Sequence, residues 1–123
     1  RNILDFINDN PHSRHFCIFD ELFSGTNPYE AVATAHAYLN HISKNKKVRF
    51  MLTTHYIKLC KFFKKHKTIV NYNMETRIQN DKAVYSYKII KGISKIKGGI
   101  MVLKELNYPA EIINNAFQTM ENL

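Results

Sequence analysis

Hydrophobic positions follow two different patterns along the chain, and the change falls at Thr68. Before Thr68, short continuous apolar runs alternate with segments whose apolar residues recur at helical spacing. A continuous apolar run is typical of a strand buried on both faces, and helical spacing is typical of an amphipathic helix. The expected strands are His15–Phe19 and Val48–Thr53, and the expected helices cover residues 1–9, 28–43 and about 57–65.

The order strand, helix, strand predicts a βαβ unit whose two strands are parallel. The connecting helix has good start signals: Asn27 suits the N-cap, Pro28 suits the first helical position, and Glu30 stands three residues after the cap. The stretch KNKK at 44–47 is a polar connection before the second strand. We therefore expect both strands to end at one edge of a sheet.

After Thr68 the pattern alternates between apolar and polar residues. The stretches 68–78 and 83–90 alternate in this way and are separated by QNDK, which predicts an antiparallel hairpin. A glycine-containing loop at 91–99 precedes two expected helices at 99–106 and 110–120, with Pro109 at the start of the second. The predicted class is α/β, with parallel strands, a β-hairpin and C-terminal helices. No internal repeat or linker divides residues 1–123, so we treat them as part of one domain.

Composition narrows the class of protein. A hydrophobic fraction of 45% is that of a globular protein, and no apolar run reaches the length of a membrane span. Cys17 and Cys60 lie far apart in apolar surroundings, which indicates reduced structural thiols and an intracellular protein, cytoplasmic or nuclear. The six histidines do not stand at metal-binding spacings with cysteines or carboxylates, so no zinc site is expected.

The net charge of +8 raises the question of nucleic acid binding. The lysines are spread over several segments, however, and four of them share one side of a predicted helix: Lys58, Lys61, Lys64 and Lys65. A solvated helix face explains that arrangement best. A supporting role in phosphate contacts stays open.

Reactive side chains follow both predicted parallel strands. Asp20 and Glu21 follow the first strand, and Thr54 and His55 follow the second. Ligands bind beyond the carboxyl ends of parallel strands, where a carboxylate commonly holds the Mg²⁺ of a nucleoside triphosphate. A second carboxylate can orient or deprotonate water, and a histidine can reach a terminal phosphate. Each signal alone is also typical of a surface cap or a structural histidine, but the combination in this order is specific.

The stretches FCIFDELFSGTNPYEA at 16–31 and MLTTHY at 51–56 resemble the second half of the MutS-family ATPase domain, an ABC-type P-loop nucleotide-binding domain. The later YSYKIIKG, the GI-x-V helix and the proline before the last helix fit the same family, so the resemblance covers nearly the whole chain. The wording DEL-x-x-GT-x-P-x-E is closer to the recombination-suppressing branch than to the mismatch-repair branch.

The resemblance implies a role for each matching residue. Asp20 corresponds to the Walker B carboxylate that helps to hold Mg²⁺, often through water. Glu21 corresponds to the catalytic carboxylate that positions the attacking water. His55 corresponds to the switch histidine that senses the γ-phosphate. Four residues match the D-loop, which lies at the dimer interface near the nucleotides: Ser24, Gly25, Thr26 and Asn27. The resemblance further implies ATP and Mg²⁺ as cofactors, dimerisation through the ATPase domain, DNA contacts through other domains, and no membrane partner.

The chain also departs from the family pattern. No G-x-x-x-x-G-K-[ST] motif occurs in the 123 residues, so the resemblance implies that the phosphate loop and the signature serine lie before Arg1. Lys97-Gly98-Gly99 stands where the family often has Ser-Tyr-Gly. We expect the chain to be the C-terminal part of an ATPase domain that lacks its Walker A half, and to be inactive alone.

Two other functions remain open. One is a non-catalytic ABC-like module that dimerises or binds nucleic acid, which the missing phosphate loop favours. The other is a different phosphate-using α/β enzyme with the Asp-Glu pair and a histidine as metal ligands. The intact set of Asp20, Glu21 and His55 favours the ATPase. A Walker A motif upstream of Arg1 would separate the ATPase from the non-catalytic module.

Overall fold

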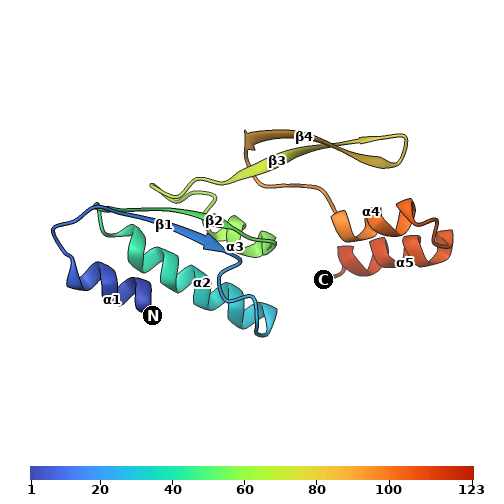
Figure 1. Cartoon of the computed structure of the whole chain (residues 1–123). Coiled ribbons are helices and arrows are strands. Elements are labelled where there is room, and N and C mark those ends of the chain that lie inside the picture. Colours follow the sequence, from blue (N-terminus) through green and yellow to red (C-terminus); the bar gives the residue numbers. More distant parts are fainter. The chain divides into compact units, whose positions relative to one another are not determined.

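Two sheets of two strands each define two units of the chain (Figure 1). The computed structural model describes residues 1–123, which divide into a first unit, Arg1–Asn71, and a second unit, Tyr72–Leu123. The prediction that both belong to one domain stays a prediction. The carboxylates and the histidine singled out in the sequence all lie in the first unit.

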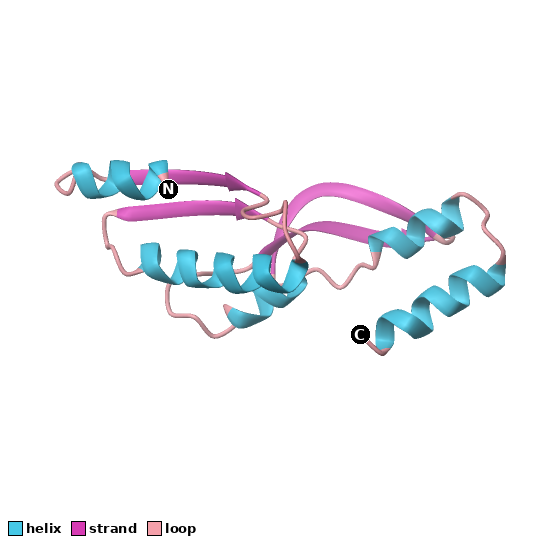
Figure 2. Ribbon diagram, turned by 90° about the horizontal axis from the view of Figure 1, so that it is seen from below, coloured by secondary structure: helices cyan, strands magenta, loops and turns pink.

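The first unit contains the predicted βαβ arrangement. Strand β1 (His15–Asp20) pairs in parallel with β2 (Val48–Thr53), and helix α2 (Pro28–Ser43) connects them. Figure 2 shows the two strands side by side, with α2 running along them. The register pairs His15 with Val48 and Asp20 with Thr53, so the two strands end together. Helices α1 (Asn2–Asp9) and α3 (Ile57–Phe62) complete the unit.

One face of this sheet carries the hydrophobic core. Its buried residues come from all three helices, both strands and the residue after α3: Ile7, Cys17, Phe19, Val32, Ala35, Leu39, Ile42, Val48, Leu59 and Phe63. Ala31 and Ala35 of α2 are completely buried, and their small side chains let the helix backbone lie close to its neighbours. This packing fixes α2 against the sheet and so fixes the points at which β1 and β2 end.

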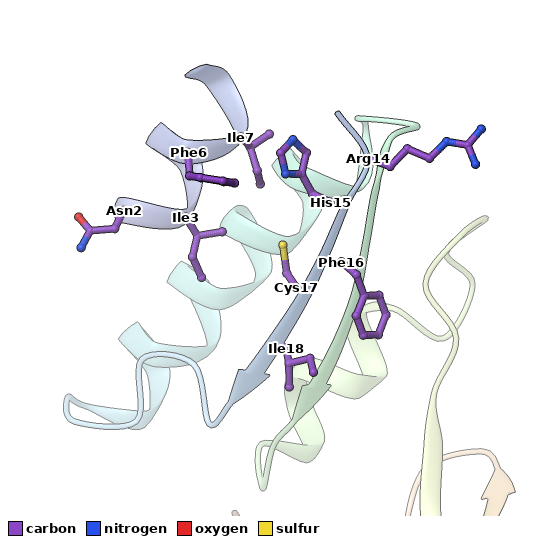
Figure 3. Close-up of a pocket in the computed structure, with 9 residues that line it drawn as sticks. All are labelled: Asn2, Ile3, Phe6, Ile7, Arg14, His15, Phe16, Cys17 and Ile18. Atoms are coloured by element: carbon purple, nitrogen blue, oxygen red, sulfur yellow. The ribbon is translucent and has the colours of Figure 1, made fainter. Parts of the chain in front are cut away.

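The expectation that β1 is buried on both faces was wrong. Successive strand residues point to opposite faces, and only the face toward the helices is covered. On the open face, the exposed fractions of Phe16, Ile18 and Met51 are 61%, 74% and 59%. Figure 3 shows Cys17 directed toward α1 and Phe16 directed away from it. A run of apolar residues therefore does not tell how many faces of this sheet the chain itself covers.

The ends of the helices follow the sequence signals in part. The side chain of Asn27 accepts a hydrogen bond from the amide of Tyr29 at 2.9 Å, which confirms the predicted N-cap of α2. Helix α3 ends at Phe62 rather than near Lys65, because only single-turn hydrogen bonds follow it, such as the one from the His66 amide to the Phe63 carbonyl. The four lysines around α3 are exposed, as a solvated face requires.

The second unit begins with the predicted hairpin. Strands β3 (Tyr72–Gln79) and β4 (Lys82–Lys91) pair antiparallel, and the turn residues Asn80 and Asp81 both have positive φ, 51° and 59°. Two left-handed residues in a two-residue turn match the twist of a hairpin. β3 starts at Tyr72 instead of Thr68. The hairpin is therefore confirmed, with a shorter first strand.

A bulge in β4 interrupts the hairpin ladder opposite Glu75, because the register shifts between Met74, which pairs with Ile89, and Thr76, which pairs with Tyr85. Side-chain hydrogen bonding to Ser86, and then to Arg77, lowers the pKa of Glu75 from its ordinary value. The Arg77 guanidinium lies 3.1 Å from the Glu75 carboxylate. Glu75 is thus tied to both strands of the hairpin, by its carboxylate to Arg77 on β3 and by its backbone carbonyl, which accepts from the Ser86 hydroxyl on β4 at 3.3 Å.

Two helices follow the hairpin, α4 (Gly98–Glu105) and α5 (Ala110–Glu121), as the sequence predicts. The Ala83 amide donates to the Glu105 carboxylate at 3.3 Å, and the ammonium group of Lys104 lies 3.7 Å from the Asp81 carboxylate. These contacts hold α4 to the tip of the hairpin. No helix in the chain has both the length and the apolar character that crossing a membrane requires. The α/β class with parallel strands, a hairpin and C-terminal helices is confirmed.

Candidate functional site

The last residues of β1 and β2 lie directly opposite each other. Asp20 pairs with Thr53 in the parallel register, and both side chains are exposed. The Thr53 hydroxyl donates a hydrogen bond to Oδ1 of Asp20 at 2.5 Å. Asp20 takes part in none of the ion pairs of the chain. Its carboxylate therefore has one hydroxyl donor and otherwise faces solvent.

The chain turns sharply at the residue after Asp20. The Glu21 amide still donates to the Thr53 carbonyl at 2.9 Å, but Glu21 itself has φ 50°, in the left-handed region. Phe23 has φ 62°, and the Ser24 amide donates back to the Glu21 carbonyl at 3.2 Å. A left-handed non-glycine residue costs on the order of 1 kcal/mol. Leu22, which packs against the core, anchors this turn.

His55 contacts the second carboxylate. Its Nε2 lies 2.5 Å from Oε1 of Glu21, with side chains that are 89% and 40% exposed respectively. The hydroxyl of Thr54 accepts a hydrogen bond from the Tyr56 amide at 3.0 Å, and the Ile57 amide donates to the His55 carbonyl at 3.0 Å. These local bonds shape the turn that presents His55. The structure thus brings Glu21 and His55 together from the ends of the two strands.

The four predicted D-loop residues do not join this cluster. Thr26 donates to the Glu30 carboxylate at 3.2 Å, and the Asn27 side chain caps α2, so both are tied to the start of that helix. Gly25 has no atom within 4 Å of the place where a Cβ would stand, and its φ is not in the left-handed region, so its surroundings do not require glycine. Ser24 contributes only its backbone amide to the turn. Predicted contacts of these residues with nucleotide and with a second subunit stay predictions.

The carboxylates at the strand ends suit a hard cation, such as Mg²⁺, that takes most of its ligands from water or phosphate. No three histidine, cysteine, aspartate or glutamate side chains lie together in the arrangement of a metal site. Mg²⁺ commonly uses only one or two carboxylates and takes its other ligands from water and phosphates. An exposed carboxylate with free oxygen lone pairs, such as Asp20, fits that mode of binding.

A groove of about 500 Å³ runs along β1 on the side of α1 (Figure 3). Phe6 on α1 and the β1 residues from His15 to Ile18 line it. Its lining includes neither carboxylate of the strand end nor His55. The groove is therefore separate from the cluster at the carboxyl edge of the sheet.

Both cysteines carry free thiols away from this cluster. Burial raises the pKa of the Cys17 thiol, which belongs to β1 and packs in the core, and burial also raises the pKa of the Cys60 thiol on α3. A raised pKa lowers the fraction of reactive thiolate at neutral pH. This agrees with their interpretation as structural thiols.

Sequence reasoning found three residues of the cluster and missed Thr53. The sequence predicts Asp20, Glu21 and His55 because they are polar residues that follow apolar strands. It marks Thr53 only as the last residue of a strand and assigns it no role. The signal that could have found it is the register, since two parallel strands of six residues place their last side chains opposite each other.

Comparisons with known proteins agree with this architecture. The family MutS domain V matches residues 2–123. The DNA mismatch repair protein MutS of Phocaeicola vulgatus is 33% identical over 117 residues, covering 94% of this chain and 13% of the relative. That of Bacteroides fragilis is 32% identical over 121 residues, covering 97% of this chain and 14% of the relative. That of Aquifex pyrophilus is 30% identical over 115 residues, covering 94% and 14%. The chain thus spans about one seventh of the length of these relatives, and it belongs to the MutS domain V family.

Proposed function

We propose that this chain is the ATP-binding and ATP-hydrolysing module of a longer MutS-like protein of DNA mismatch repair or recombination. The observation that carries the proposal is the carboxyl edge of the parallel strands, where Asp20 ends β1 and the next residue, Glu21, contacts His55 from the end of β2. The MutS domain V match and the mismatch repair relatives support it.

Asp20 and Glu21 have different surroundings, which suits different tasks. Asp20 is free of cationic partners, so its oxygens are available to Mg²⁺ or to water bound to Mg²⁺. The bound ion would neutralise charge on the phosphates of ATP. Glu21 contacts the imidazole of His55 and projects from the turn after the strand. In the role that we propose, its carboxylate orients a water molecule and takes its proton.

The side chain of His55 is 89% exposed and is not part of the core, so it can leave Glu21 without unpacking the core. In the proposal its imidazole reaches the γ-phosphate of ATP once nucleotide is bound. Donors aimed at a group whose charge changes during reaction favour the transition state over the ground state. His55 therefore serves turnover more than ground-state affinity.

In this proposal, Asp20, Glu21 and His55 form only part of the nucleotide site, and the phosphate loop and the D-loop complete it. The chain contains no G-x-x-x-x-G-K-[ST] sequence, so a phosphate loop is to be supplied by another part of the longer protein. We assign the D-loop, at a dimer interface near the nucleotides, to four residues: Ser24, Gly25, Thr26 and Asn27. DNA is bound by other domains, and the protein acts inside the cell.

The branch of the family is a further part of the proposal. The loop wording DELFSGTNPYE favours the recombination-suppressing branch. The relatives named above are mismatch repair proteins, with identities of 30 to 33%. Binding of the full-length protein to a mismatched duplex, compared with a branched DNA junction, distinguishes the two branches.

The role of Asp20 is tested by the substitution Asp20→Asn in the full-length protein. The amide keeps the size of the side chain but removes the charge that attracts Mg²⁺, so ATP binding in the presence of Mg²⁺ should weaken while binding in EDTA stays the same. Asp9→Asn, at an exposed position near the end of α1, is the matched control. Unchanged Mg²⁺-dependent ATP binding in Asp20→Asn would contradict the proposed metal site.

The net charge of +8 favours a second candidate, a non-catalytic module that dimerises or binds nucleic acid through its basic surface. Salt dependence separates the two, because binding by phosphate contacts weakens steeply as salt rises. Strongly salt-dependent DNA binding by residues 1–123, together with no ATP binding by the full-length protein, would favour this candidate.

A further inference from the structure

Thr53 contacts both carboxylate residues of the cluster, although neither the sequence motifs nor the proposed function gives it a task. Its hydroxyl donates to the Asp20 carboxylate at 2.5 Å, and its backbone carbonyl accepts from the Glu21 amide at 2.9 Å. Building on the proposed function, we propose that Thr53 is a positioning residue whose hydroxyl holds the Asp20 carboxylate ready to bind Mg²⁺.

The strand register makes this contact specific. Asp20 and Thr53 are partners in the parallel ladder, so their side chains leave the sheet on the same face. Both backbones are fixed by the pairing of β1 with β2 and by the core beneath them. A β-branched threonine also has a restricted χ1 angle in such a position. The Thr53 hydroxyl is therefore held in position by a strand of the sheet rather than by a loop.

Asp20 depends on this one partner. No other side chain donates a hydrogen bond to its carboxylate, and it takes part in no ion pair. One donated bond occupies part of Oδ1 and leaves Oδ2 and the remaining lone pairs free for a cation or its waters. A hydroxyl bonded to an ionised carboxylate makes a strong, charge-assisted hydrogen bond. Thr53 can thus restrict the rotation of Asp20 without competing for the metal.

Without the hydroxyl, the Asp20 side chain should be less ordered before the metal binds. Mg²⁺ binding would then have to include the entropy cost of ordering Asp20, and the Mg²⁺ affinity should fall. Partners that orient metal ligands commonly change metal affinity by about 10- to 100-fold, and an exposed pair belongs near the lower end. The hydrogen bond that the Glu21 amide donates to the Thr53 carbonyl does not depend on the Thr53 side chain, so the turn at Glu21 should survive substitution. The expected defect is therefore confined to the Mg²⁺ dependence.

The experiment measures binding of a non-hydrolysable ATP analogue to the full-length protein at increasing Mg²⁺, and again in EDTA. Thr53→Val removes the hydroxyl but keeps the branched shape, and Thr53→Ser keeps the hydroxyl. Thr53→Ala is a second variant without the hydroxyl, should Val fit the strand end poorly. Thr34→Val is the control, because the Thr34 hydroxyl donates to a carbonyl of its own helix, at Glu30.

We expect Thr53→Val and Thr53→Ala to raise the Mg²⁺ concentration at half-saturation about 10-fold. Binding in EDTA and the Tm should stay unchanged, and Thr53→Ser should restore most of the Mg²⁺ affinity. Coincident Mg²⁺ titrations of wild type and both hydroxyl-free variants would overturn the inference. So would a Thr53→Ser variant as impaired as Thr53→Val, because that result would assign the effect to packing.

Asp20→Asn in the same titration separates this inference from the proposed function. If Asp20→Asn has the wild-type Mg²⁺ dependence, the proposed metal site itself fails. If Asp20→Asn is impaired while Thr53→Val is not, only the positioning role fails. If Thr53 acts through Asp20, adding Thr53→Val to Asp20→Asn should produce no further loss, whereas independent effects would add.

Discussion

At the scale of single residues, the two carboxylates at the end of β1 are held in different ways. Asp20 ends the strand and bonds to a hydroxyl, whereas Glu21 begins a left-handed turn and contacts His55. The sequence predicts that these residues lie at one edge, because parallel strands end on the same side of a sheet. It does not predict the pairing, because that depends on the register and on a left-handed non-glycine residue that no turn motif marks.

Replacing His55 tests the role of the imidazole. In the full-length protein, His55→Ala should reduce turnover more than it weakens ATP binding, because the proposed contact with the γ-phosphate gains strength as the phosphate's charge shifts. Steady-state hydrolysis beside equilibrium ATP and ADP binding measures both effects. His41→Ala, at an exposed position on α2, is the control. Equal weakening of ATP and ADP binding with unchanged turnover per bound ATP would indicate a structural histidine.

At the scale of elements, sequence patterns locate the helices and strands well and their ends less well. The N-cap at Asn27 was predictable because its side chain acts on its own helix. The start of β3 was not, because the amides of Thr68 and Ile69 donate to the ring of His66, at 3.2 and 3.1 Å, and form a turn. Alternating apolar residues indicate a strand, but a nearby side-chain acceptor can hydrogen-bond to the backbone amides that the strand would otherwise use in the sheet.

The cap of α2 should be measurable in the full-length protein. Asn27→Ala removes the acceptor of the Tyr29 amide. Such a loss costs about 1 kcal/mol, so the first turn of α2 should exchange its amide hydrogens about fivefold faster. Asn27→Asp, which keeps a capping oxygen, is the control. Hydrogen-exchange mass spectrometry of the peptide that covers residues 27–34 makes the comparison, and equal exchange in Asn27→Ala and wild type would show that the cap contributes nothing.

At the scale of the whole molecule, the parallel sheet has one uncovered face. Parallel sheets normally have both faces covered, yet Phe16, Ile18 and Met51 are all exposed on the face opposite the core. The apolar run 15–19 predicts a strand, but the number of covered faces depends on segments that the local sequence does not describe. The chain spans 13 to 14% of the length of its relatives.

Residues 1–123 alone should therefore self-associate and should not hydrolyse ATP. The open apolar face and the unpaired outer edges of β1 and β2 favour association between copies. Light scattering over a concentration series, with and without the paired substitutions Ile18→Lys and Met51→Lys, tests this expectation. A monomer with a sharp two-state melt would contradict it. Mg²⁺-dependent turnover that Asp20→Ala abolishes would contradict the expected inactivity.

The most direct test of the catalytic account is single-turnover hydrolysis by Glu21→Gln in the full-length protein, beside equilibrium ATP binding. The amide keeps the size and polarity of the side chain but cannot take a proton from water. ATP should bind as in wild type, while hydrolysis should fall by roughly 10²-fold or more, the usual scale for loss of a general base. Glu111→Gln, at an exposed position in the first turn of α5, is the control. Hydrolysis by Glu21→Gln at a near wild-type rate would show that Glu21 only ends a strand, and the catalytic account would be wrong.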